Sequence, residues 1–328
     1  MRFLLDDEQR AFARSLDALL TAADTPAVVR AWATGDHRPG LTLWRRLADA
    51  GVFALAVPQA YGGVGPLPVE TAVAFVELGR HGMPGPVVES AAAGALLGGV
   101  GGPVAKEWLA RIAAGTAVVS LVLEGYGPYV LDGDVADAVF TVTGDELRLG
   151  RAAGEPTPSM DPARRLLRPE AGGEVVAAGP RVREAARAAG DRATFMTAAQ
   201  APGCGEALLR ATVAYVKQRT RFGVPVGSFQ AVKYRLADTL LGLEFARPLV
   251  YGAAVELAEG SPGAGAAVAA AKVAAGEAGY AAARTALQLH GAVGYTEELD
   301  LAWWLRRARP LRDAWGTPSA CRARVVAG

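Results

Sequence analysis

The chain has 328 residues and only two cysteines, Cys204 and Cys321. Two cysteines are too few for a disulfide framework, and their separation matches no zinc-binding spacing. This scarcity excludes the small disulfide-rich classes of secreted protein. We therefore expect a protein of a reducing compartment, and we assign it to the cytoplasm.

The chain has no excess of charge of either sign. It also has no long apolar run. Its 34 Lys and Arg balance 33 Asp and Glu, which gives a formal net charge of +1. Such a balance provides no basic surface for nucleic acid. A membrane helix needs about 18 or more consecutive apolar residues, and a signal peptide needs an apolar core where this chain has Asp6 and Asp7. We expect neither a nucleic-acid partner nor a membrane span.

A chain of this length can bury a sizeable core and suggests two or three packed units. Residues 1–115 have the pattern of amphipathic helices. Asp6 or Asp7 can cap the first of them, and Phe12, Leu16 and Leu20 recur at helical spacing behind it. The first unit is therefore predicted to be helical.

Residues 116–180 have a different pattern, in which short β-rich runs alternate with Gly and Asp. The runs cover residues 118–124, 129–132, 138–142 and 146–149. Such runs predict a small antiparallel sheet.

From about residue 181 the helical pattern returns. A first long helix is predicted to be kinked or divided at Pro202, which has no backbone N–H. Two more long helices are predicted over 230–259 and 264–290, separated by a Gly-Ser-Pro-Gly stop, and a shorter one over 299–309. Four antiparallel helices of this length form a bundle. The predicted fold class is α+β, mainly α, in the order helices, sheet, helices.

The first motif with chemical content is Arg219-Thr-Arg-Phe222-Gly223, followed by Gln230. Guanidinium groups form bidentate, charge-assisted hydrogen bonds with phosphate, and the glycine allows a close turn. The alternative is an arginine-rich helix end that the helix dipole favours.

The second motif is Gln288-Leu-His290-Gly291-Ala292-Val-Gly294-Tyr295. A glycine-rich turn after a helix brings backbone N–H groups close to a phosphate, although such turns are often only helix ends. His290 is either a phosphate ligand or a contact within the bundle.

These two motifs, with Arg306-Arg307-Ala308 after them, resemble the C-terminal signature of the acyl-CoA dehydrogenases. The pattern Trp44-x-x-Leu-Ala-x-x-Gly51, followed by Tyr61-Gly-Gly, is similar to the N-terminal domain of the same family. The resemblance covers nearly the whole chain. It implies an N-terminal helical domain (1–115), a shortened β-domain (116–180) and a C-terminal four-helix bundle (181–328).

The family resemblance also implies an FAD cofactor, an acyl-CoA or other acyl thioester substrate, and an electron-transfer acceptor. In such enzymes a carboxylate removes the proton α to the thioester carbonyl while the flavin takes the β-hydride. The residues that match the family's FAD-binding positions are Arg219, Phe222, Gln230, Gln288, Gly291, Ala292 and Thr317. Ala292 replaces a glycine of the family pattern.

The chain departs from the family at the catalytic base. Seven residues beyond Ala308 the family has the glutamate of a Glu-Gly-Thr triplet, and this chain has Trp315-Gly316-Thr317. An indole offers only a donor N–H and cannot take a proton from a substrate. The stretch between Glu124 and Ala136 is also too short for the strands that usually contact the flavin ring. The catalytic residue is therefore unknown.

Three interpretations follow from this departure. The first is a subunit that works with a catalytically complete acyl-CoA dehydrogenase-like chain in a homo- or hetero-oligomer, as in actinobacterial heterotetramers that act on steroid side chains. The second is a self-sufficient flavoenzyme with different chemistry or with a relocated base, for which Asp191, Glu297 and Glu298 are candidates, although acids of this kind are usually solvated. The third is a flavin-free structural subunit. Trp303 and Trp304 are expected to make packing or subunit contacts.

Overall fold

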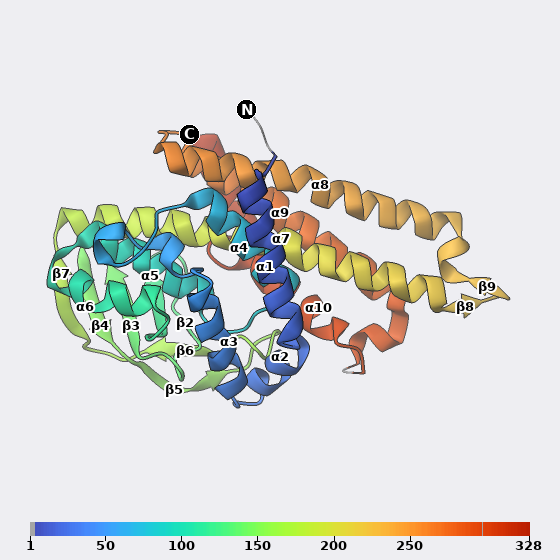
Figure 1. Cartoon of the computed structure of the whole chain (residues 1–328), viewed down its shortest axis with the longest axis horizontal. Helices are drawn as coiled ribbons and strands as arrows, with labels where there is room; N and C mark the ends of the chain where they lie inside the picture. Colours follow the sequence, from blue (N-terminus) through green and yellow to red (C-terminus); the bar gives the residue numbers. More distant parts are fainter. Residues whose placement is uncertain (1–3, 297) are drawn as a thin grey trace.

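The structure is a computed structural model that describes residues 4–296 and 298–328. Long helices run across the molecule, the β-sheets lie at one end of its long axis, and a β-hairpin projects at the other end (Figure 1). The predicted fold class, mainly helical with small sheets and a C-terminal bundle, is confirmed. None of the described helices is long and apolar enough to span a membrane.

The N-terminal part is helical, as predicted. Asp6 caps the first helix: its carboxylate accepts a hydrogen bond from the Gln9 backbone N–H at 2.8 Å, and the Gln9 side chain accepts one from the Asp6 N–H at 3.1 Å. This reciprocal capping satisfies two N–H groups that a helix start leaves free. The elements are α1 (Asp7–Ala22), α2 (Thr25–Ala33), α3 (Arg38–Asp49), η1 (Ala54–Ala56), η2 (Gln59–Tyr61), α4 (Pro68–Arg80), α5 (Val87–Val100) and α6 (Gly102–Ala113).

The middle segment forms two sheets. The strands are β1 (Val119–Leu123), β2 (Val130–Leu131), β3 (Ala138–Thr143), β4 (Glu146–Gly150), β5 (Ala152–Thr157), β6 (Leu166–Pro169) and β7 (Glu174–Ala178). One sheet has the order β1-β3-β4-β7 and the other β2-β6-β5. The prediction of one antiparallel sheet is wrong, because β1 and β3 pair in parallel. The chain leaves β1 to form β2 in the second sheet and then returns beside β1 in the same direction.

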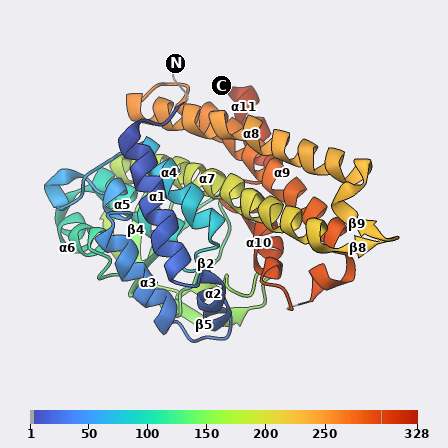
Figure 2. The ribbon, with the colours of Figure 1, turned by 45° about the vertical axis from the view of Figure 1, so that its right-hand side comes forward.

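The C-terminal part contains the long helices. Its elements are α7 (Pro180–Gln218), β8 (Thr220–Arg221), β9 (Val224–Pro225), η3 (Val226–Ser228), α8 (Gln230–Glu259), α9 (Ala264–His290), η4 (Gly291–Tyr295), α10 (Leu301–Asp313) and α11 (Pro318–Ala327). Figure 2 shows α7, α8 and α9 side by side as the body of the bundle. The bounds of α8 and α9 agree with the prediction, whereas α10 continues through Pro310 and α11 was not predicted.

Helix α7 is not divided at Pro202 but continues through it. A proline inside a helix costs about 3 kcal/mol, so other contacts must hold this segment. Helix α4 packs against it without space for side chains. A Cβ atom on Gly79 would lie 2.0 Å from the Gln200 carbonyl oxygen, and one on Gly203 would lie 2.0 Å from that of Val76. The close packing of α4 on either side of Pro202 offsets the lost hydrogen bond.

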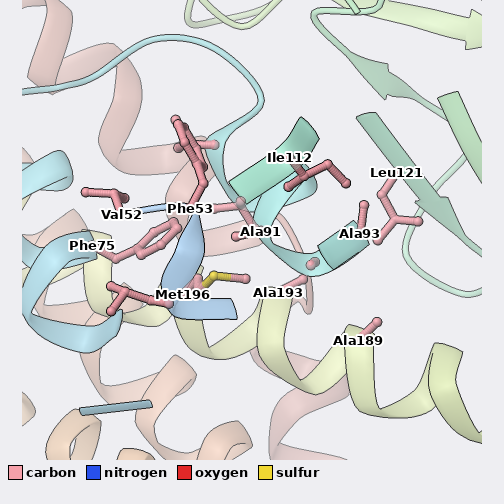
Figure 3. Packing of buried hydrophobic residues seen from close by; sticks show 14 of the residues in the cluster. Val52, Phe53, Phe75, Ala91, Ala93, Ile112, Leu121, Ala189, Ala193 and Met196 are labelled. Carbon is pink, nitrogen blue, oxygen red and sulfur yellow. The ribbon is translucent and has the colours of Figure 1, made fainter. Parts of the chain in front are cut away.

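The main hydrophobic core joins the three parts of the chain. Phe53 lies in the turn before η1, Phe75 and Ala91 on N-terminal helices, Leu121 on β1 and Met196 on α7, and all of them are buried (Figure 3). Because one core contains side chains from the helices and from the β1-β3-β4-β7 sheet, this sheet is packed directly against the bundle.

A buried ion pair also ties α10 to distant segments. The Arg307 guanidinium contacts the Asp161 carboxylate, and it donates a second hydrogen bond to the Met83 carbonyl oxygen at 3.0 Å. Arg307 belongs to the Arg-Arg-Ala motif of the sequence. Its role in this structure is to hold α10 against the turn between α4 and α5.

Asp132 is a second buried carboxyl group that joins separate segments. Its Oδ1 accepts hydrogen bonds from Trp32 Nε1 at 3.1 Å and from the Arg165 N–H at 3.2 Å, and its Oδ2 has no partner among the described residues. Burial raises the pKa of Asp132 to about 7. Between these pKa values the Asp132 carboxyl therefore stays protonated in the folded chain. In the unfolded chain, where its pKa has the ordinary value of 3.8, it is ionised.

We expect Asp132→Asn to change how stability depends on pH. Because the folded-state pKa is raised, this group stabilises the fold below pH 4, and that contribution is lost as the pH rises towards 7, at roughly 1.4 kcal/mol per pH unit. The variant should therefore gain stability relative to the parent chain between about pH 4 and 7. Denaturant unfolding at several pH values measures the difference. The exposed Glu107→Gln is the control and should show no such trend.

Candidate active site and cofactor hollow

A hollow of about 670 Å³ lies at the end of the bundle near the β8–β9 hairpin. It forms because α7 ends at Gln218, the hairpin turns the chain back, and α9 ends at Gly291, whose φ of +66° favours glycine. The hollow is lined by Tyr215, Arg219, Arg221, Val226, Gln288, Leu289, His290, Gly291, Ala292, Val293 and Leu299. The structure thus brings together four of the residues matched to FAD-binding positions, Arg219, Gln288, Gly291 and Ala292, from two motifs far apart in the sequence.

The charge of the hollow comes from Arg219 and Arg221. Both side chains are exposed, and among the described residues neither has a hydrogen-bond or ion-pair partner for its guanidinium group. Two unpaired guanidinium groups beside a glycine turn form a site suited to an anion such as a diphosphate. These donors fit the phosphate-containing half of FAD.

The three other residues matched to FAD-binding positions do not line this hollow. Phe222, at the tip of the β8–β9 hairpin, is 95% exposed and has a φ of +52°. Gln230 is exposed at the start of α8. Thr317 lies next to the Trp315 segment and caps α11, where its hydroxyl accepts a hydrogen bond from the Ala320 N–H at 3.3 Å. The FAD-binding roles of these three residues, like those of the four in the hollow, remain predictions.

His290 belongs to the bundle more than to the hollow. Its Nδ1 lies 2.8 Å from the Ala286 carbonyl oxygen, and its ring stacks on Tyr215 with the centroids 4.2 Å apart. Burial lowers the pKa of His290, so the ring is neutral near pH 7. Of the two interpretations of this residue, the contact within the bundle has the support of these interactions.

Trp315 fills the position predicted for the catalytic base. It is only 8% exposed and has a φ of +54°, in the left-handed region. Its Nε1 donates a hydrogen bond to Glu89 Oε1 at 2.9 Å, and its carbonyl oxygen accepts one from the Thr194 hydroxyl at 2.7 Å. The indole is therefore held from α5, and the backbone of Trp315 from α7.

The cavity beside Trp315 is small. It measures about 160 Å³ and lies between the end of α10 and strands β1, β2 and β6. Its lining is Glu89, Leu121, Val122, Leu123, Tyr126, Gly127, Tyr129, Leu131, Arg164, Leu166, Ala314 and Trp315. Cofactor sites usually need about 300 to 1,000 Å³. The volume in this chain lies below that range.

Glu89 is the acid at this cavity that the sequence analysis missed. Burial raises the pKa of its carboxyl, and the charge of Arg164 opposes that shift. Its Oε2 is buried and has no partner among the described residues. The signal in the sequence was a single carboxylate among Val, Ala and Gly in the otherwise apolar run that became α5.

The acids that were proposed as relocated bases do not line this cavity. Asp191 is buried in an ion pair with Arg324, with the closest N and O atoms 2.6 Å apart. Glu298 is exposed, and Glu297 lies outside the described residues. Neither Asp191 nor Glu298 lines the cavity beside Trp315.

Trp303 and Trp304 pack within the chain. Trp304 Nε1 donates a hydrogen bond to the Arg80 carbonyl oxygen at 2.9 Å, and Trp303 packs against the cluster that contains Trp32. The predicted packing role is therefore the one that the structure supports. Helix α8, by contrast, carries a group of exposed apolar side chains that includes Tyr234 (61% exposed), Leu241 (53%), Phe245 (73%) and Leu249 (45%).

Comparisons with known proteins agree with this architecture. The N-terminal domain model of the acyl-CoA dehydrogenases matches residues 6–116, and the C-terminal domain model matches residues 184–327. The acyl-CoA dehydrogenase IpdE2 of Mycobacterium tuberculosis is 36% identical over 305 residues, which cover 92% of this chain and 91% of the relative.

Two solved structures are also similar. A chain of the ChsE4-ChsE5 complex from Mycobacterium tuberculosis has a TM-score of 0.86 at 26% identity and covers 100% of this chain and 98% of its own length. A chain of the Tcur3481-Tcur3483 steroid acyl-CoA dehydrogenase variant has a TM-score of 0.86 at 25% identity, with coverage of 98% and 97%. The chain belongs to the acyl-CoA dehydrogenase family, whose members are flavoprotein oxidoreductases that act on CH–CH bonds.

We expect Trp315→Glu to destabilise the fold near pH 7. The new carboxylate replaces a hydrogen-bond donor and lies beside the buried Glu89, and two close carboxyl groups resist ionising together. Breaking such a buried arrangement costs roughly 3 kcal/mol or more. The stability should recover as the pH falls, because one shared proton then relieves the repulsion.

Denaturant unfolding of the single variant and of the double variant with Glu89→Gln tests this prediction. The amide can donate a hydrogen bond to the new carboxylate, so the double variant should regain most of the lost stability. Equal instability of the two variants at pH 7 would show that the loss of indole packing, and not the carboxyl pair, is the cause.

Proposed function

We propose that this chain is a subunit of an FAD-dependent acyl-CoA dehydrogenase that works with a partner chain carrying the catalytic glutamate. The observation that carries the proposal is Trp315, which is hydrogen-bonded to Glu89 and leaves a cavity of about 160 Å³ where a base, a thioester and a flavin ring would have to meet. The cofactor hollow, which residues of both sequence motifs line, is open and positively charged. The chain therefore has the means to bind part of the cofactor without the means to complete the reaction.

In this assembly the chain's own residues bind and position. Arg219 and Arg221 hold the diphosphate of FAD, and Gln288 and the turn at Gly291 contribute an amide and backbone N–H groups. FAD, when bound, supplies the hydride acceptor for α,β-desaturation of the acyl thioester. An external electron-transfer acceptor belongs to the same proposal, because the cofactor has to be reoxidised.

Two further observations support a partner. The α8 positions 234, 241, 245 and 249 fall on one face of the helix, and their exposed apolar side chains form the kind of surface that marks an interface. The similar chains of known structure come from complexes whose names give two different proteins, ChsE4-ChsE5 and Tcur3481-Tcur3483. Both favour a hetero-oligomer, with an acyl-CoA dehydrogenase-like chain as the partner.

The first test concerns cofactor binding by the chain co-purified with an acyl-CoA dehydrogenase-like partner. We expect Arg219→Ala to weaken FAD binding roughly tenfold to a hundredfold, because a charge-assisted hydrogen bond contributes about 1.5 to 3 kcal/mol. Flavin absorbance relative to protein absorbance measures the occupancy. The exposed Arg210→Ala on α7 lies outside the hollow and should retain full occupancy. Unchanged occupancy in Arg219→Ala would remove the hollow from the proposal.

The second test concerns turnover. We expect the isolated chain to give no acceptor reduction with straight-chain or bulky acyl-CoA substrates, and Trp315→Glu alone to give none either, because the cavity is too small for the reacting groups. General-base help contributes roughly two to four orders of magnitude in rate, so its absence is easy to measure. Steady-state assays of the chain alone and of the co-purified complex make the comparison. Turnover by the unmodified chain alone would favour the self-sufficient enzyme, and Glu89 would be the first acid to replace.

A further inference from the structure

A second cavity, separate from both sites above, lies between α5, α7 and the loop before α4. Its volume is about 210 Å³. The lining residues are Leu55, Ala56, Pro58, Pro66, Thr71, Ala95, Gly98, Gly99, Ala188, Arg192 and Met196. It shares no residue with the cofactor hollow or with the Trp315 cavity. Nothing in the proposed reaction uses it.

The walls of this cavity are apolar except at two side chains. Thr71 donates its hydroxyl proton to the Leu67 carbonyl oxygen at 2.7 Å, so it offers no donor to a ligand. Arg192 is therefore the cationic donor of the cavity, since the remaining lining side chains carry no charge. A single guanidinium group in a partly open, mainly apolar pocket favours a ligand with one negative charge and an apolar body.

Arg192 is half-buried, and among the described residues its guanidinium has neither an ion pair nor a hydrogen bond. The adjacent acid, Asp191, is taken by Arg324 of α11 at 2.6 Å. Burial lowers the pKa of Arg192, and the charge of the adjacent Asp191, which is paired with Arg324, opposes that shift only in part. Four other buried or half-buried arginines are paired with acids, Arg80, Arg165, Arg307 and Arg324, whereas the half-buried Arg164 has no such pair among the described residues. A desolvated cation without a partner is costly unless a ligand supplies the anion.

The shape of the cavity depends on the close approach of the loop to α5. A Cβ atom on Gly98 would lie 3.0 Å from Pro58 Cγ, and one on Gly99 would lie 2.9 Å from the Ala185 Cβ atom. Gly98 thus lets the loop approach α5, and Gly99 lets α7 approach it. An enclosed apolar cavity of about 150 Å³ is known to hold a benzene ring, so 210 Å³ accommodates a hydrocarbon group of slightly larger size.

We propose that this cavity binds a short-chain monocarboxylate, with the carboxylate on Arg192 and the hydrocarbon tail against Ala95, Gly98 and Met196. The planar guanidinium matches a carboxylate with two parallel N–H donors. A diphosphate is a poorer match because a single cation faces it. The site is independent of the proposed dehydrogenase function, since neither FAD nor a thioester takes part in it.

Isothermal titration calorimetry on the full-length chain with hexanoate tests the proposal. We expect saturable binding of one hexanoate per chain, and much weaker binding of 1-hexanol, which has the same tail without the charge. Arg192→Met should weaken hexanoate binding roughly tenfold to a hundredfold and leave hexanol binding unchanged. Arg187→Met, on the exposed side of the same helix, is the matched control and should bind hexanoate like the parent chain.

A second variant separates the cavity from the charge. Ala95→Leu fills part of the apolar wall and keeps Arg192, so it should weaken both hexanoate and hexanol, with thermal unfolding used to confirm that the chain is folded. The proposal is overturned if the parent chain shows no saturable heat up to about 10 mM hexanoate, ten times a 1 mM Kd. It is equally overturned if Arg192→Met and Arg187→Met bind hexanoate with the same affinity.

Discussion

The contact on which the rest of the structure depends is the close packing of α4 against α7 at Gly79 and Gly203. Neither position has space for a Cβ atom, because each faces a backbone carbonyl of the other helix. This contact carries α7 through Pro202 as one helix of 39 residues. Helix α7 then positions one residue at each site. Arg192 lies in the cavity proposed to bind a carboxylate, Thr194 donates a hydrogen bond to the Trp315 carbonyl oxygen, and Arg219, directly after the helix, lies at the cofactor hollow. A shift in this helix therefore moves all three sites together.

Trp315 changes the polarity of the position and not only its identity. A glutamate at this position would present an acceptor for a proton, whereas the indole presents a donor, and the donor has a buried acceptor in Glu89. The pair is internally satisfied at Oε1, and burial favours the protonated form of the carboxyl. The indole and the carboxyl group can therefore be buried together as part of the packed interior. This explains how the fold tolerates a large residue at the catalytic position of the family.

Much of the fold could be predicted from local signals. The ends of α8 and α9 follow from Gly260 and Gly291, which provide the positive φ values that end a helix. The features that were missed depend on contacts distant in sequence. Pro202 predicts a kink or a division of the helix, and the close packing of α4 at Gly79 and Gly203 holds α7 continuous there. The parallel pairing of β1 with β3 is possible because β2, the strand between them in sequence, belongs to the second sheet. The spacing of apolar residues along the sequence does not show which sheet a strand joins.

The candidate site, like the fold, could be predicted from the sequence only in part. Arg219, Gln288, Gly291 and Ala292 share the hollow that their two motifs implied, and Trp315 was found by counting from Ala308. Glu89 was not found, because its significance comes from meeting an indole 226 residues away in the sequence. Arg192 could not be found either, since an arginine without a partner is recognisable only after the neighbouring acid is seen to pair elsewhere.

The exposed apolar face of α8 has a consequence for how the protein persists in a cell. A partner that covers this face binds the folded chain and not the unfolded one, so by mass action the apparent stability rises with the concentration of free partner, by about 2.7 kcal/mol at 100 times Kd. A copy without a partner lacks this contribution and keeps Phe245 in water at 73% exposure. In the proposed assembly, unpaired copies would therefore spend more time unfolded, which is the state that proteases remove.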